Sequence, residues 1–88
     1  MKIPVKSEQV AYRIIDKEAV LVLLDRQETV VLNEVGARIW EIIDAKKTLD
    51  EIARLISSEF EVTYEEARKD ASGFIEDMAA KGAIVAHS

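Results

Sequence analysis

The sequence has 88 residues, of which 49% are hydrophobic and 33% are charged, a size and balance typical of one small globular domain with a single core. It contains no cysteine, which excludes disulfides, zinc–thiolate sites and a thiol nucleophile. The formal net charge of −5 opposes binding to nucleic acid or anionic lipid through a general electrostatic field. No stretch has the length of a membrane span and no signal peptide is recognisable, so we expect a cytoplasmic protein with no membrane partner.

The first half of the chain predicts an antiparallel sheet. Residues 1–9 contain the only proline and are predicted to be an N-terminal arm, which leaves residues 10–88 as the domain. Three apolar stretches, at residues 10–15, 19–24 and 28–32, are separated by short polar breaks. Because a parallel crossover needs a dozen residues or more, neighbouring stretches should pair as antiparallel strands in sequence order. The middle stretch lacks polar residues and should be central, so residues 28–32 should form an edge strand.

The second half predicts three helices. Asn33 directly follows the third strand and can cap a helix over residues 34–44. Thr48 and Thr63 each begin the capping-box pattern of a further helix, and the last of these helices should end near Lys81. The expected fold is therefore α+β: a small winged helix-turn-helix-like domain in which a three-stranded antiparallel sheet is followed by three helices.

Few residues could carry catalysis or bind a metal. His87 is the only histidine, and it lies next to the C-terminus, where no rigid neighbour would orient it. Glu66, Asp70 and Asp77 share a helix face, but Asp77 and Lys81 have the spacing of an ordinary surface ion pair. The three glycines are isolated, so no phosphate-binding loop is present. We therefore predict no catalytic residue, no metal ligand and no cofactor, and expect that the protein is not an enzyme.

The predicted edge strand is the strongest candidate for a binding site. Residues 29–32 would present unpaired backbone groups, with no proline, lysine or glycine to discourage pairing. An extended peptide could add there as a further strand and place its side chains in a groove against the third helix. Ala71, Ile75 and Met78 could form the helix wall of that groove, although the same stripe also fits ordinary core packing.

Three other uses of these elements stay open. Residues 83–86 could form a strand that covers the edge, or a second copy could pair with it in a homodimer that serves as a structural subunit. The helix-turn-helix proportions also fit a DNA-binding regulator. However, Arg68, Lys69 and Lys81 of the third helix are outnumbered by acidic residues, which would be repelled by phosphates. We therefore predict no nucleic-acid partner.

Several motifs carry a resemblance to a known family. They are the run LNEVGARIWE at residues 32–41, TLDEIA at residues 48–53, Asp70 with Phe74 and Ile75, and Gly82 with Ala83 and Ile84. Together they resemble the PqqD family, which comprises coenzyme PQQ synthesis protein D and its relatives, also called RiPP precursor-peptide recognition elements. The resemblance spans about Val10 to Val85. The family usually has glycine after the Asp44 position and valine after the Asp70 position, whereas this sequence has alanine at both, which indicates a PqqD-like relative.

The resemblance implies a peptide-binding chaperone. In that family a winged-helix domain holds the leader of a ribosomally made precursor peptide between its third strand and third helix, and presents it to a modifying enzyme, often a radical SAM protein. By position, the leader would lie along Glu28, Thr29, Val30, Val31 and Leu32, with its side chains against Arg68, Ala71, Ile75 and Met78. Any cofactor would belong to the partner enzyme, in PQQ or related biosynthesis.

Overall fold

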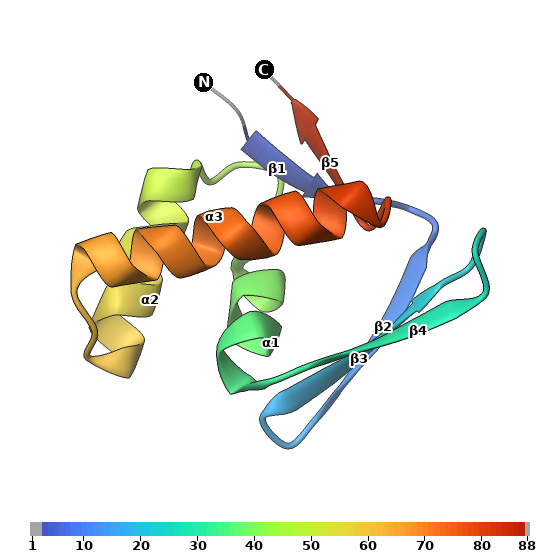
Figure 1. Cartoon of the computed structure of the whole chain (residues 1–88), viewed down its shortest axis with the longest axis horizontal. Helices are drawn as coiled ribbons and strands as arrows, with labels where there is room; N and C mark the ends of the chain where they lie inside the picture. Colours follow the sequence, from blue (N-terminus) through green and yellow to red (C-terminus); the bar gives the residue numbers. More distant parts are fainter. Residues whose placement is uncertain (1–2, 88) are drawn as a thin grey trace.

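The computed structural model describes residues 3–87, and it contains a three-stranded sheet, three helices and a separate pair of terminal strands (Figure 1). The elements in chain order are β1 (Ile3–Lys6), β2 (Val10–Ile15), β3 (Glu18–Leu23), β4 (Glu28–Leu32), α1 (Glu34–Ile42), α2 (Leu49–Phe60), α3 (Tyr64–Ala80) and β5 (Ile84–His87). The predicted α+β fold, with its antiparallel sheet followed by three helices, is confirmed.

The three-stranded sheet has the predicted strand order β2-β3-β4, so β3 is central and β4 lies at an edge. All pairs are antiparallel, and Leu21 of β3 lies opposite Val30 of β4. Leu21 and Leu32 point into the core and are buried, whereas Val31 points to the other face of the sheet and is 65% exposed. This alternation gives β4 one packed face and one face open to solvent.

The two chain ends form a second, two-stranded sheet. β1 pairs with β5 antiparallel, with Val5 opposite Val85. The predicted N-terminal arm therefore contains a strand, and the C-terminal segment pairs with that strand and not with β4. Gly82 has a φ of +81°, a left-handed conformation that suits glycine and lets the chain leave α3 at a sharp turn. The chain then directs Ala83 and Ile84 into the core, where both are buried.

The helices begin where the sequence predicts. The Asn33 side chain accepts a hydrogen bond from the Gly36 N–H at 2.9 Å, so the chain passes from β4 into α1 with a single connecting residue. Thr48 caps α2 through the predicted reciprocal capping box. Thr63 caps α3 by accepting a hydrogen bond from the Glu66 N–H, but the return bond from the Thr63 N–H to the Glu66 side chain, also predicted, does not form. The first helix is shorter than expected and ends at Ile42, because Ile43 is already extended.

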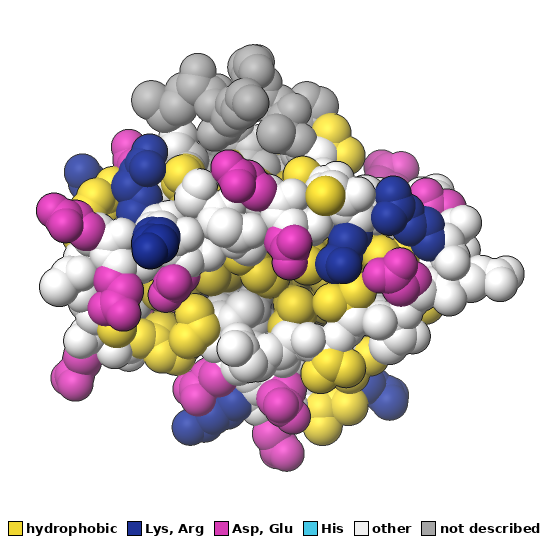
Figure 2. All heavy atoms as spheres, viewed as in Figure 1, with side chains coloured by type: hydrophobic (Ala, Val, Ile, Leu, Met, Phe, Trp, Pro, Cys, Tyr) yellow, Lys and Arg dark blue, Asp and Glu magenta, His cyan; other side chains and the backbone are white. Residues whose placement is uncertain are grey.

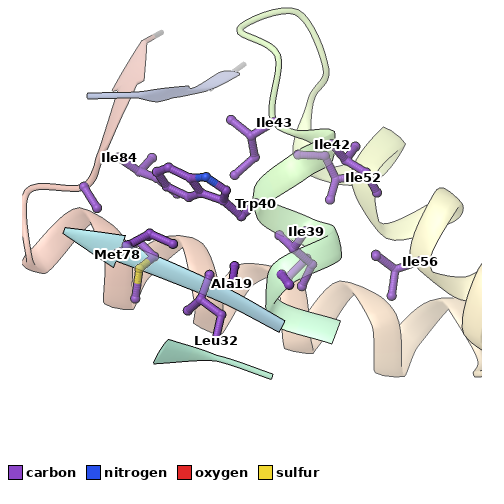
Figure 3. Close-up of a cluster of buried hydrophobic side chains, with 14 of the residues drawn as sticks. Ala19, Leu32, Ile39, Trp40, Ile42, Ile43, Ile52, Ile56, Met78 and Ile84 are labelled. Carbon is purple, nitrogen blue, oxygen red and sulfur yellow. The ribbon is translucent and has the colours of Figure 1, made fainter. Parts of the chain in front are cut away.

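Trp40 of α1 is the largest fully buried side chain among the described residues, and side chains from several other elements pack around it. Figure 3 shows its indole extending from α1 toward Ile84 and Met78. The Tyr12 ring packs edge-on against it with ring centres 5.5 Å apart, and the Lys6 ammonium lies 5.1 Å from the centre of the indole. Side chains from β1, β2, α1, α3 and β5 therefore meet around one residue.

The turn between α1 and α2 offers a test of backbone strain. Ala45 has a φ of +67°, a left-handed conformation that is unfavourable for alanine. We expect Ala45→Gly to raise the free energy of unfolding by about 0.5 to 1 kcal/mol, as measured by urea denaturation. The control Ala79→Gly, near the end of α3, should lower it by about the same amount. A loss of stability in both variants would contradict the strain at Ala45.

Candidate functional site

The free edge of β4 is the main candidate site. Within residues 3–87, β4 pairs only with β3, so its backbone N–H and C=O groups on the other side have no strand partner. The predicted possibility that residues 83–86 cover this edge is not what the structure shows, because Ile84–His87 pairs with β1. The edge is therefore open to another strand.

α3 runs beside β4 in the opposite direction, and contacts at the two ends fix its position. Near the end of β4, a methyl group placed on Gly36 would lie 3.5 Å from both Leu32 Cβ and Phe74 Cε1, so the Leu32 and Phe74 side chains both lie beside Gly36. Near the start of β4, Lys81 Nζ lies 3.8 Å from Glu28 Oε2. One exposed ion pair adds little stability, but together the two contacts define which side of α3 faces β4.

We call this region the α3–β4 face, and define it as β4 together with the side of α3 that carries Phe74 and Lys81. Figure 2 shows it from the front, with a band of hydrophobic side chains gathered below α3. Val30 and Phe74 are half-buried at the margin of the core. The face therefore combines a free strand edge with apolar surface beside it.

The structure separates the predicted α3 residues into two groups. Ala71 and Met78 are 0% and 3% exposed, so they lie beneath the helix in the core and support the wall from below. Ile75 is half-buried, and Arg68 is exposed. Sequence periodicity places the core and the predicted wall on one stripe, and the structure assigns most of that stripe to the core.

The Arg68 side chain forms an ion pair with a neighbouring helix. Its Nε donates to Asp50 Oδ1 of α2 at 2.9 Å, and the Tyr64 hydroxyl donates to the same oxygen at 2.8 Å. The Arg68 guanidinium, and then the Tyr64 hydroxyl, lower the pKa of the Asp50 carboxyl. At about 100° per residue, Arg68 lies about 120° around the helix from Phe74. Arg68 thus joins α3 to α2 and does not point toward β4.

Other residues of α3 do share the side that faces β4. Asp70, Phe74, Asp77 and Lys81 recur at spacings of four, three and four residues, which places them on one side of a helix. The four-residue spacing predicts an ion pair between Asp77 and Lys81, but in the structure Lys81 lies against Glu28 of β4. The sequence shows that these four residues share one side of α3, but it does not show that this side faces β4.

The described residues contain no candidate metal centre. No cluster of three or more acidic or histidine side chains within residues 3–87 could hold a metal ion. The predicted tail residue His87 belongs to β5 by its backbone, and its side chain lies outside the described part. None of the helices in residues 3–87 has the length and apolar character needed to cross a bilayer.

Comparisons with known proteins give a consistent result. The profile of the family described as coenzyme PQQ synthesis protein D (PqqD) matches residues 18–84. TbiB1, solved in complex with the TbiA(β) leader peptide, is similar with 28% identity and a TM-score of 0.86 over 96% of this chain and 98% of TbiB1. No curated protein matches the sequence.

Two further solved structures share the fold. A lasso peptide synthetase B1 complexed with its leader peptide has 20% identity and a TM-score of 0.82, covering 93% of this chain and 96% of the synthetase chain. The PqqD truncation of Methylobacterium extorquens PqqCD, described as a stand-alone RiPP recognition element, has 16% identity and a TM-score of 0.78 over 94% and 88% of the two chains. The fold seen here is therefore the fold of these proteins.

The close contact at Gly36 generates a stability prediction. Gly36→Val would place its Cβ 3.3 Å from the capping oxygen of Asn33 and force a branched side chain against Leu32 and Phe74. We expect it to lower the free energy of unfolding by about 1 to 3 kcal/mol in urea denaturation. Gly73→Val is the matched control, because a Cβ at Gly73 meets nothing within 4 Å. It should change the stability by less than about 0.5 kcal/mol. Equal effects of the two substitutions would show that the contact does not constrain α3.

Proposed function

Because the chain belongs to the PqqD family, we propose that it is a peptide-binding chaperone that recognises the leader of a ribosomally made precursor peptide. The observation that carries this proposal is the free edge of β4 beside the apolar band below α3. The complex of TbiB1 with a leader peptide, at 28% identity over nearly the whole chain, supports the same use of this fold.

The binding mode is strand addition. The leader lies extended along Glu28, Thr29, Val30, Val31 and Leu32, and its backbone pairs with the free groups of β4. Alternate leader side chains point toward the core side of the sheet, where Phe74 presents an apolar surface. The further α3 residues proposed for this site have different roles. Ala71 and Met78 support its surface from below, Ile75 is half-buried, and Arg68 holds α3 in position through its pairing with Asp50 of α2.

The free edge of β4 and the apolar surface beside it contribute differently to the binding of a peptide. Each backbone hydrogen bond adds a net of about 0.5 to 1.5 kcal/mol and accepts any sequence, because backbone groups are the same in every peptide. Apolar contacts add about 25 cal/mol per Å² and depend on which side chains the peptide carries. Ordering a flexible leader costs part of this energy. Affinity thus comes from the edge and the apolar band together, and selectivity comes from the side chains beside α3.

In the proposed role, the protein is a peptide-binding chaperone and not an enzyme. It presents the bound leader, in the cytoplasm, to a separate peptide-modifying enzyme, a radical SAM protein or another type, in the PQQ pathway or a related one. The cofactor and the chemistry belong to that enzyme. A nucleic acid or a membrane has no part in the proposal, and pairing of β4 with a second copy in a homodimer is the competing use of the same edge.

The proposal can be tested without knowing the natural precursor. Peptides that bind the immobilised protein are selected from a displayed library of random sequences, and the best is titrated into isotope-labelled protein by NMR. We expect amide shifts concentrated on Glu28–Leu32 and on the side of α3 that carries Phe74. The other sheet edge, Val10–Ile15, is an internal control. Shifts at that edge alone, or a concentration-independent dimer in sedimentation with no selected binder, would contradict the proposal.

A second test addresses the strand pairing itself. In an added β-strand only every other peptide N–H faces its partner strand. Two versions of the selected peptide, one N-methylated at its odd-numbered positions and the other at its even-numbered positions, should therefore differ in their affinity for the protein. We expect one version to lose about tenfold or more in affinity and the other to keep most of it, as measured by calorimetry. An equal loss in both versions would count against pairing with β4.

A further inference from the structure

The side of α3 that faces β4 carries an excess of negative charge. Asp70 and Asp77 are exposed, and they lie on either side of Phe74 on the same helix side. The ammonium group of Lys81, on that side as well, already pairs with Glu28. Figure 2 shows acidic side chains on α3 along the margin of the hydrophobic band. A peptide that adds to β4 would run directly past these carboxylates.

Neither carboxylate is neutralised by a neighbour within the part of the chain that the structure describes. The ion pairs between side chains there involve other acidic residues, among them Asp44, Asp50 and Glu59, and none includes Asp70 or Asp77. Several acidic residues of the surface thus have internal cationic partners, whereas the two beside Phe74 have none among the described residues. Their charges stay available to a ligand.

The spacing of the two carboxylates matches an extended peptide. Asp77 follows Asp70 by seven positions along the helix, a rise of about 10.5 Å. In a strand, side chains on one face recur every second residue, so residues i and i+4 lie about 13 Å apart with residue i+2 between them. The long, flexible side chains of lysine or arginine can bridge the difference. The middle residue would then contact Phe74, which lies between the two aspartates in the sequence of α3.

We infer that the leader recognised here carries an apolar residue bracketed by a lysine or arginine two positions away on each side. This inference rests on the proposed function, and it names the chemistry by which the site selects its substrate. Asp70 and Asp77 attract the two cationic side chains, and Phe74 packs against the apolar one. A leader with acidic residues at the same two positions is rejected, because like charges would face each other across the new strand pair.

The test uses two double variants with the same change in net charge. Asp70→Asn with Asp77→Asn removes both carboxylates of the site. Glu65→Gln with Glu76→Gln removes two exposed carboxylates from the opposite side of α3, because these residues lie about 160° to 180° around the helix from Phe74. The probe is a cationic peptide selected on the wild-type protein from the displayed random library, and calorimetry measures its affinity for all three proteins.

We expect the peptides selected on the wild-type protein to be enriched in the bracketed pattern. The first double variant should bind the probe about threefold to tenfold more weakly, as expected for two partly exposed ion pairs, and the control should bind it within about twofold of wild type. The difference between the variants should shrink at high salt, because exposed charges are screened.

Failure of this inference can be told apart from failure of the proposed function. If the selected peptides shift the amides of β4 but show no bracketed pattern, or bind both double variants equally well, the charge selection is overturned and strand addition stands. If the selected peptides shift amides elsewhere, or if no peptide is selected, both are overturned. NMR titration of each variant with the same probe supplies this distinction, and circular dichroism confirms that both variants are folded.

Discussion

The candidate site depends on the close contact of Leu32, Gly36 and Phe74. Leu32 ends β4, Gly36 lies in the first turn of α1, and Phe74 comes from the middle of α3, so the contact joins three elements at one point. Because glycine has no side chain, the Phe74 ring can lie against the first turn of α1, at the position that Leu32 also borders. The contact holds one end of β4 beside α3 while the rest of the strand keeps its edge free.

The terminal strands protect that arrangement. A short apolar segment at the C-terminus could pair with any exposed strand edge, and β4 would be an available partner. β5 instead pairs with β1, and Ile84 packs toward Trp40 in the core (Figure 3). The Lys6 side chain extends over the Trp40 and Tyr12 rings, which adds a further link between β1 and the core. Within residues 3–87, the terminal strands thus pair with each other, and the outer edge of β4 stays unpaired.

Local signals in the sequence were sufficient to predict much of the fold. Asn33 and Thr48 cap their helices as expected because capping depends on a few neighbouring residues, and β3 is central because its sequence has no polar face. The pairing of β1 with β5 could not be predicted, because two short strands about 80 residues apart in sequence carry no local signal of each other.

The walls of the site were harder to predict than its strand. The edge of β4 follows from strand order, but helical periodicity marks only which stripe of α3 is apolar, and not which neighbour each side contacts. The structure shows that Arg68 turns to Asp50 of α2, and that Lys81 reaches Glu28 of β4. Both contacts join residues from different elements, so only the packed structure reveals that Phe74 lies next to β4.

The pairing of β1 with β5 also brings the two ends of the described chain together. Ile3 lies opposite His87, and Figure 1 shows both ends leaving the same side of the molecule, away from β4. A linker attached to either end would therefore leave the strand edge uncovered. The geometry suits a modular unit, because further chain could be attached at either end without covering β4.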